Sequence, residues 1–98
     1  MTYIQVIIEI IKNINSRLTD QTDLSWTKYK RAFELKSELE KDIQELNKGN
    51  QEILEKFNLY FAPTGTFQEI AIPNGWGEDF ILMANDFDKL YKKIKAST

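Results

Sequence analysis

Carboxylates without neighbouring cations set one stretch of this sequence apart. Residues 57–88 contain no lysine or arginine but five acidic side chains, namely Glu69, Glu78, Asp79, Asp86 and Asp88. Carboxylates steer a basic partner towards a surface, and large aromatic side chains supply much of the affinity at protein interfaces. Phe67 and Trp76 are among the aromatic side chains of the same stretch. This pattern predicts a surface that binds a basic protein, formed by Phe67, Glu69, Trp76, Glu78, Asp79 and Asp86.

The same residues also fit a purely structural role. Large aromatic side chains are usually buried, so Trp76 could close the end of a helical bundle. Glu78 and Asp79 could serve only to complement the dipole of the helix that begins beside them. The sequence leaves both interpretations open.

Most catalytic chemistry is excluded by what the chain lacks. It has no cysteine and no histidine, which removes thiolate nucleophiles, the commonest general base and the commonest zinc ligand. Neighbouring acids such as Asp86 and Asp88 do not face each other on a helix, so they make a poor metal or acid–base set. The glycine-containing segments lack the lysine of a phosphate loop. We therefore expect no catalytic residue, no metal and no cofactor.

Composition and charge limit the fold and the kinds of partner that the protein can have. The 98 residues are 42% hydrophobic and 29% charged, which is typical of one folded domain spanning residues 1–98. A pI near 5.1 argues against general binding to nucleic acid, and the basic cluster at Lys28, Lys30 and Arg31 is expected to meet acidic helix neighbours. The longest apolar stretch, residues 3–14, is too short to cross a membrane. We expect a cytoplasmic protein.

Helical periodicity dominates the first two thirds of the chain. Apolar residues recur at helical spacing from Ile4 to Leu18, and Thr2 is placed to cap that helix. A second helix is expected to begin near Asp23 or Ser25, and a third to follow a break at Gly49-Asn50 and end before Pro63. The alternative is one continuous helix over residues 23–61.

The segment from 62 to 77 differs in composition from the rest of the chain, because it contains both prolines and three of the four glycines. It is expected to be a structured loop, with a short helical turn or a short strand at 66–72; a capping box from Thr66 to Glu69 favours the turn. A last helix should start near Glu78. The sequence thus predicts an all-α, single-domain bundle of about four helices.

The chain resembles small helical bacterial immunity proteins. The resemblance rests on the length of the chain, on its lack of cysteine and histidine, and on the amino-acid sequence of residues 62–70 and 74–77. It implies a cytoplasmic antidote that binds a cognate toxin domain, often a nuclease, and covers its active site or an essential surface. A helical adaptor or self-associating module, and hence a possible homodimer, is the alternative.

Overall fold

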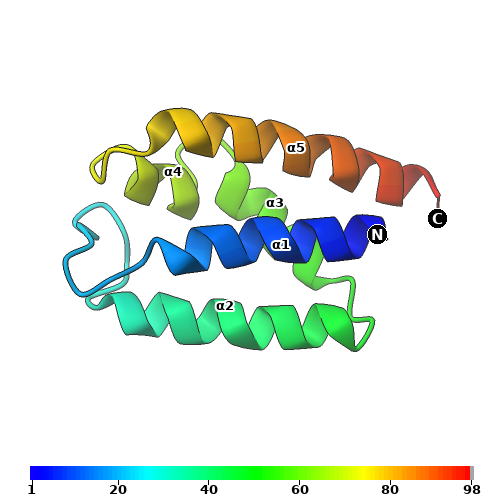
Figure 1. The fold of residues 1–98 in the computed structure, drawn as a ribbon, viewed down its shortest axis with the longest axis horizontal. Coiled ribbons are helices and arrows are strands. Elements are labelled where there is room, and N and C mark those ends of the chain that lie inside the picture. The colour runs from blue at the N-terminus through cyan, green and yellow to red at the C-terminus, as the bar shows by residue number, and fades with distance from the viewer. Residues whose placement is uncertain (98) are drawn as a thin grey trace.

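A computed structural model describes residues 1–97, and these fold into five α-helices without a strand. The helices are α1 (Tyr3–Ser16), α2 (Ala32–Asn47), α3 (Ile53–Phe61), α4 (Thr66–Ala71) and α5 (Gly77–Ala96). The longest three, α1, α2 and α5, extend along the long axis of the molecule (Figure 1). The prediction of an all-α bundle is confirmed.

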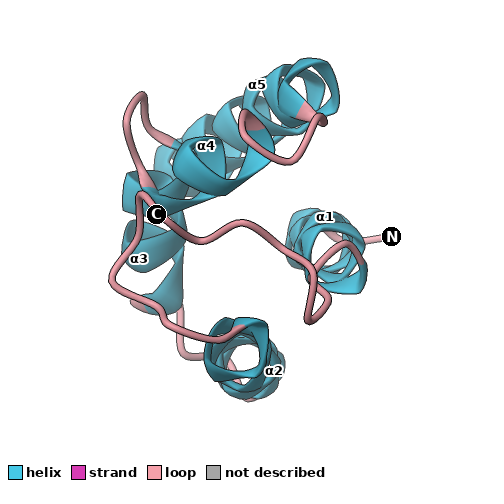
Figure 2. Cartoon of the chain, turned by 90° about the vertical axis from the view of Figure 1, so that its left-hand side faces the viewer, coloured by secondary structure: helices cyan, strands magenta, loops and turns pink. Residues whose placement is uncertain are grey.

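The four longer helices form a closed ring around one core. Helix α1 packs on α2 and α5, and α3 packs on the same two helices, so that each helix has two neighbours (Figure 2). The short helix α4 packs on α3 and α5 at one end of the bundle. This leaves α5 covered along one side by three helices and open along the other.

Helix α1 forms as its residue spacing predicts. Its buried side chains are isoleucines at helical spacing, and Thr2 caps its first turn: the backbone N–H of Gln5 donates to Thr2 Oγ1 at 3.1 Å. The side chain of Gln5 accepts from the Thr2 N–H at 3.0 Å, which completes a capping box. Local sequence therefore fixes both the start and the buried face of this helix.

The helix break at Gly49 is also confirmed. Gly49 has a φ of +94°, which favours glycine, and its N–H donates to the carbonyl of Leu46 at 3.0 Å. The N–H of Asn50 reaches back to the carbonyl of Glu45 at 3.0 Å, so residues beyond the helix donate to two carbonyls of its last turn. The alternative of one continuous helix over 23–61 is wrong, because this cap ends α2 and turns the chain into α3.

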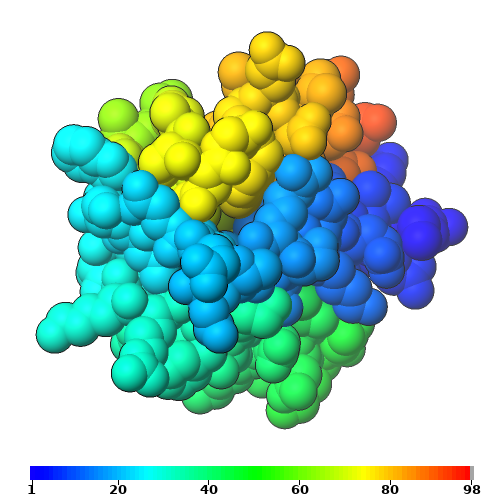
Figure 3. All heavy atoms as spheres, turned by 60° about the vertical axis from the view of Figure 1, so that its left-hand side comes forward, coloured from blue at the N-terminus to red at the C-terminus, as the bar shows by residue number. Residues whose placement is uncertain are grey.

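The expected start of the second helix near Asp23 or Ser25 is wrong, since α2 begins at Ala32. Local side-chain bonds hold the preceding chain in turns instead: Asp23 Oδ1 accepts from the Ser25 N–H at 2.9 Å, and Thr27 Oγ1 from the Tyr29 N–H at 3.1 Å. Such bonds compete with helix formation. Figure 3 shows this segment (blue to cyan) against the chain around residues 70–77 (yellow).

Residues 66–71 form helix α4, so the helical alternative for this segment is confirmed and the strand is wrong. The predicted capping box does not form, because Gly65 and not Thr66 is the N-cap. A Cβ on Gly65 would collide with the carbonyl oxygens of Leu59, Tyr60 and Ala62. The chain can fold back this tightly after α3 only because residue 65 is a glycine.

Candidate docking surface

The two aromatic rings expected at the binding surface lie in the core. Phe67 is fully buried and makes edge contacts with Tyr60 and Phe61, at centroid distances of 5.2 and 4.9 Å. Trp76 is 9% exposed and lies under the guanidinium of Arg17, 5.2 Å from the ring centroid. The prediction that these rings are presented to a partner is wrong, because packing at the end of the bundle buries them.

The predicted carboxylates remain outside but do not act alike. Asp79 forms an ion pair with Arg17 at 3.1 Å, so its charge is compensated within the chain. Glu78 and Asp86 are exposed on α5, and neither has an ion-pair partner among residues 1–97. Glu69 is half-buried on α4. The structure thus gathers Trp76, Glu78 and Asp79 around one shallow hollow and leaves Asp86 two turns further along α5.

An apolar groove with a volume of 480 Å³ runs between α3 and α5. Its floor contains three buried rings, Phe61, Phe80 and Phe87, with Phe61 stacked 4.6 Å from Phe87 and 6.2 Å from Phe80. Its sides include Leu59 and Ile81, which are 69% and 57% exposed. Because the floor rings also form the core, the groove is preformed and rigid.

Polar side chains surround this groove. Asn58 and Gln68 lie on the side of α3 and α4, and Asn85 and Asp88 on the side of α5. Asp88 forms an ion pair with Lys92 at 2.9 Å. An apolar centre with a polar margin is the usual anatomy of a protein-binding surface.

The open side of α5 extends this apolar area. Ile81 and Leu82 are more than half exposed; Leu82 lies one helical turn from both Glu78 and Asp86, whereas Ile81 lies one turn from Glu78 and lines the groove. Helix α5 buries only a narrow stripe, in which Phe80, Phe87 and Ile94 are seven residues apart. Within residues 1–97 the two aliphatic side chains are therefore only partly covered, and Leu82 lies between two carboxylates that have no ion-pair partner there.

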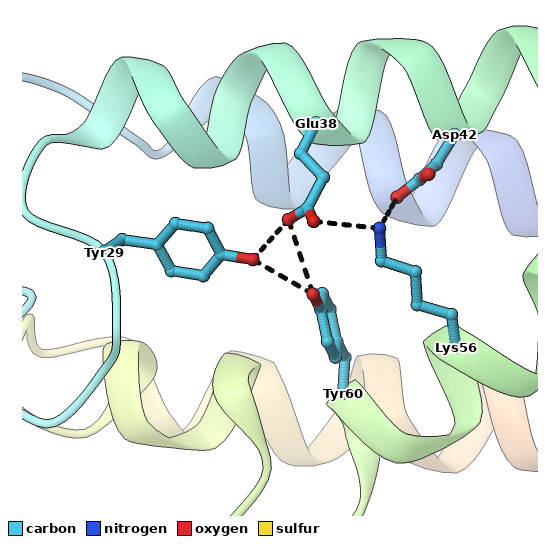
Figure 4. A network of polar contacts seen from close by, with 5 residues as sticks. All are labelled: Tyr29, Glu38, Asp42, Lys56 and Tyr60. Carbon is cyan, nitrogen blue, oxygen red and sulfur yellow. Dashed lines mark hydrogen bonds and ion pairs between the residues drawn. The ribbon is translucent and has the colours of Figure 1, made fainter.

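A polar network lies between α2 and α3, and sequence reasoning missed it (Figure 4). Lys56 of α3 forms ion pairs with Glu38 at 3.1 Å and with Asp42 at 2.7 Å. The phenol of Tyr29 donates to Glu38, and the phenol oxygens of Tyr29 and Tyr60 lie 3.0 Å apart. Paired spacings of four residues, 38/42 on one helix and 56/60 on the next, were the available signal.

The network shifts the pKa values of three of its members, Tyr29, Glu38 and Lys56. Burial raises the pKa of Tyr29 above its ordinary value, and the hydrogen bond to Glu38 adds to that rise. Partial burial alone would raise the pKa of Glu38, but hydrogen bonds from Tyr29 and Lys56 outweigh it and lower the pKa. Burial alone would lower the pKa of Lys56, but hydrogen bonds to Asp42 and Glu38 outweigh it and raise the pKa. Glu38 and Lys56 are therefore held charged and paired while Tyr29 stays a neutral hydrogen-bond donor, which suits a structural role in joining α2 to α3.

The basic cluster at Lys28, Lys30 and Arg31 makes no ion pair with acidic neighbours within residues 1–97, although Lys28 is close enough to Glu38 to help lower the pKa of that carboxyl. All three side chains are exposed, and within the described part of the chain none forms an ion pair. The nearest candidate, Glu34, instead accepts from the backbone N–H groups of Lys30 and Arg31 at 2.9 and 2.8 Å. These cations therefore face outward from the loop before α2.

Residues 1–97 contain neither a candidate metal site nor a helix that could cross a membrane. No cluster of three or more acidic side chains could hold a metal ion. No helix combines the length and the apolar composition needed to span a bilayer.

In comparisons with known proteins, no family model matches the chain, and no significant match is found among curated proteins or solved structures.

Proposed function

We propose that this chain is a non-enzymatic protein-binding module of the immunity type, which neutralises a basic bacterial toxin domain by covering one of its essential surfaces in the cytoplasm. One observation carries the proposal: two aliphatic side chains of α5 are more than half exposed, Leu82 between the carboxylates of Glu78 and Asp86, and Ile81 at the edge of the groove between α3 and α5. An exposed apolar area with a charged margin is a mark of a protein interaction site.

The charge of the surface favours a basic partner. Residues 57–88 supply the whole of the groove's lining and contain no lysine or arginine. Glu78 and Asp86 have no cation to compensate them, so a partner's lysine or arginine side chains gain new ion pairs on docking. Complementary charge of this kind raises the association rate and rejects acidic competitors. Nucleases, which bind a polyanion, present such a basic surface.

Phe67 and Trp76 take a different part in this proposal from the one the sequence suggests. They support the surface from below, since Phe67 contacts Phe61, which forms part of the groove floor. In this proposal the apolar side chains that touch the toxin domain are Leu59, Ile81 and Leu82. Asp79 is left out of the contact because Arg17 already compensates it.

The first test is whether a gene next to this one encodes a toxin domain, since its absence would contradict the proposal; the second is co-expression with that domain. Expression of that domain alone should arrest growth, and co-expression of this chain should restore it. The double variant Ile81→Lys/Leu82→Lys should fail to restore growth while keeping its helical circular dichroism spectrum. Tyr3→Lys, which places a single lysine at an exposed ring on α1, is the control for an added surface charge and should protect like the wild type. Protection by the double variant would reject this surface.

A further inference from the structure

The loop before α2 presents an aromatic and basic surface that the proposed function does not use. Trp26 is 72% exposed and Phe33 is 56% exposed. Between them lie three outward-facing cations, Lys28, Lys30 and Arg31. Tryptophan and arginine are the residue types that most often carry binding energy at interfaces, and large exposed aromatic side chains are uncommon.

This loop is held in one conformation. The buried ring of Tyr29 fixes its centre through the hydrogen bond to Glu38, and Thr27 Oγ1 donates to the carbonyl of Leu24 at 2.9 Å. Asn74, in the turn before α5, binds the backbone of Asp23 near the start of the loop. Trp26 is thus displayed from an anchored segment, which lowers the entropy that docking would cost.

The groove between α3 and α5 has the opposite properties. It is lined by aromatic and aliphatic side chains, and Ile81 at its edge lies one helical turn from Glu78, an exposed carboxylate without an ion-pair partner among residues 1–97. Trp26 does not line this groove, so the two surfaces are separate on the same molecule. One surface offers an exposed indole with cations, and the other an open aromatic cleft with a carboxylate at its edge.

We propose that this chain associates head to tail with a second copy of itself: Trp26 of one molecule enters the groove between α3 and α5 of the next, and Lys28, Lys30 and Arg31 face the carboxylate of Glu78 at the edge of that groove. The contact joins two different surfaces. A chain of associated molecules therefore keeps one unused groove at one end and one unused Trp26 at the other, so that it either grows further or closes into a ring. This arrangement also makes self-association and partner binding compete for one groove.

Two complementary variants test the geometry. Trp26→Ala keeps the groove, and Ile81→Lys keeps the tryptophan. In sedimentation equilibrium the wild-type mass should rise with concentration, and each variant alone should stay monomeric. A mixture of the two variants should form a dimer and stop there, because only one productive contact exists between them. Tyr3→Lys, folded and far from both surfaces in sequence, should associate like the wild type.

The outcomes separate this inference from the proposed function. A wild-type chain that stays monomeric at all concentrations overturns head-to-tail association, as does a mixture of the variants that forms no dimer. Dimers formed by each variant alone would place the contact elsewhere and also overturn it. Trp26→Ala retains the groove, so its ability to neutralise the toxin reports on the proposed function alone. High salt should reduce the association, because the cations and the carboxylate at the contact are exposed.

Discussion

The side-chain amide of Asn74 binds both backbone polar groups of Asp23, a residue 51 positions earlier in the chain. Asn74 Oδ1 accepts from the Asp23 N–H at 2.8 Å, and Nδ2 donates to the Asp23 carbonyl at 2.8 Å. The same Nδ2 also donates to the carbonyl of Ile70 at 2.7 Å. One side chain therefore joins the loop after α1 to the end of α4 and to the turn that leads into α5.

Replacement of Asn74 by alanine should loosen this joint. We expect Asn74→Ala to lower the free energy of unfolding by about 1–3 kcal/mol, because it leaves both backbone groups of Asp23 without their partner and removes one of the two hydrogen bonds to the Ile70 carbonyl. Urea unfolding measures this loss, and hydrogen exchange at the Asp23 amide should accelerate more than exchange within α1. Asn47→Ala, at the exposed end of α2, is the control and should change stability by less than about 0.5 kcal/mol. Equal effects of the two substitutions would contradict the assigned role.

The ion pairs of Lys56 predict a strong asymmetry between single and double substitutions. Lys56→Met should lower the free energy of unfolding by about 3 kcal/mol, because Asp42 is only 6% exposed and would keep a buried charge without its cation. Adding Asp42→Leu should recover most of that loss, since a buried ion pair can be exchanged for apolar residues at little cost. Additive losses in thermal or urea unfolding would show that the pair is not coupled.

Acid should weaken the fold through Glu38. Its pKa is lowered in the folded state, so its contribution is complete above the ordinary value near 4.5 and is lost as the pH falls through the lower folded pKa. The stability difference between the wild type and Glu38→Gln should therefore shrink as unfolding is measured at pH values progressively below 4.5. Glu40→Gln, an exposed site on α2, should show no such pH-dependent difference from the wild type. A difference for Glu38→Gln that stays constant down to strongly acidic pH would contradict this linkage.

Two glycines should respond in opposite directions to alanine. Gly65→Ala should destabilise by more than about 2 kcal/mol, since its Cβ would meet three backbone carbonyl oxygens that cannot move aside independently. Gly77→Ala should be neutral or stabilising by up to about 1 kcal/mol, because its nearest neighbour would be an Ile72 side-chain carbon at 3.6 Å and it begins a helix. Differential scanning calorimetry of the two variants checks the contrast. Similar melting temperatures for the two variants would show that the turn after α3 is not tightly closed.

The parts of the fold that sequence predicts are those fixed by near neighbours. Helix α1 depends on the Thr2 cap and a run of isoleucines, and the end of α2 depends on Gly49 at positive φ. The chain from 19 to 31 could not be predicted in this way. Its conformation depends on Asn74 and on Tyr29 reaching Glu38, and neither contact has a local signature.

Sequence predicts the acidic residues of the candidate site but not the apolar residues that anchor a partner there. Glu78 and Asp86 are exposed because they fall on the open side of a regular helix, which periodicity reveals. The burial of Trp76 depends on how the turn before α5 folds onto Arg17, a contact between distant segments. Ile81 and Leu82 fit the apolar composition of any helix, and only the packing of α5 shows that they stay more than half exposed.

The most direct test of the docking surface is the affinity of the purified chain for the toxin domain encoded beside it, measured by calorimetry. The wild type and the control Tyr3→Lys should bind with equal affinity. Ile81→Lys/Leu82→Lys should bind at least about 100-fold more weakly, a loss of about 2.7 kcal/mol, because it buries two cations against a basic partner. An affinity within twofold of the wild type, with the fold intact, would contradict the assignment of this surface.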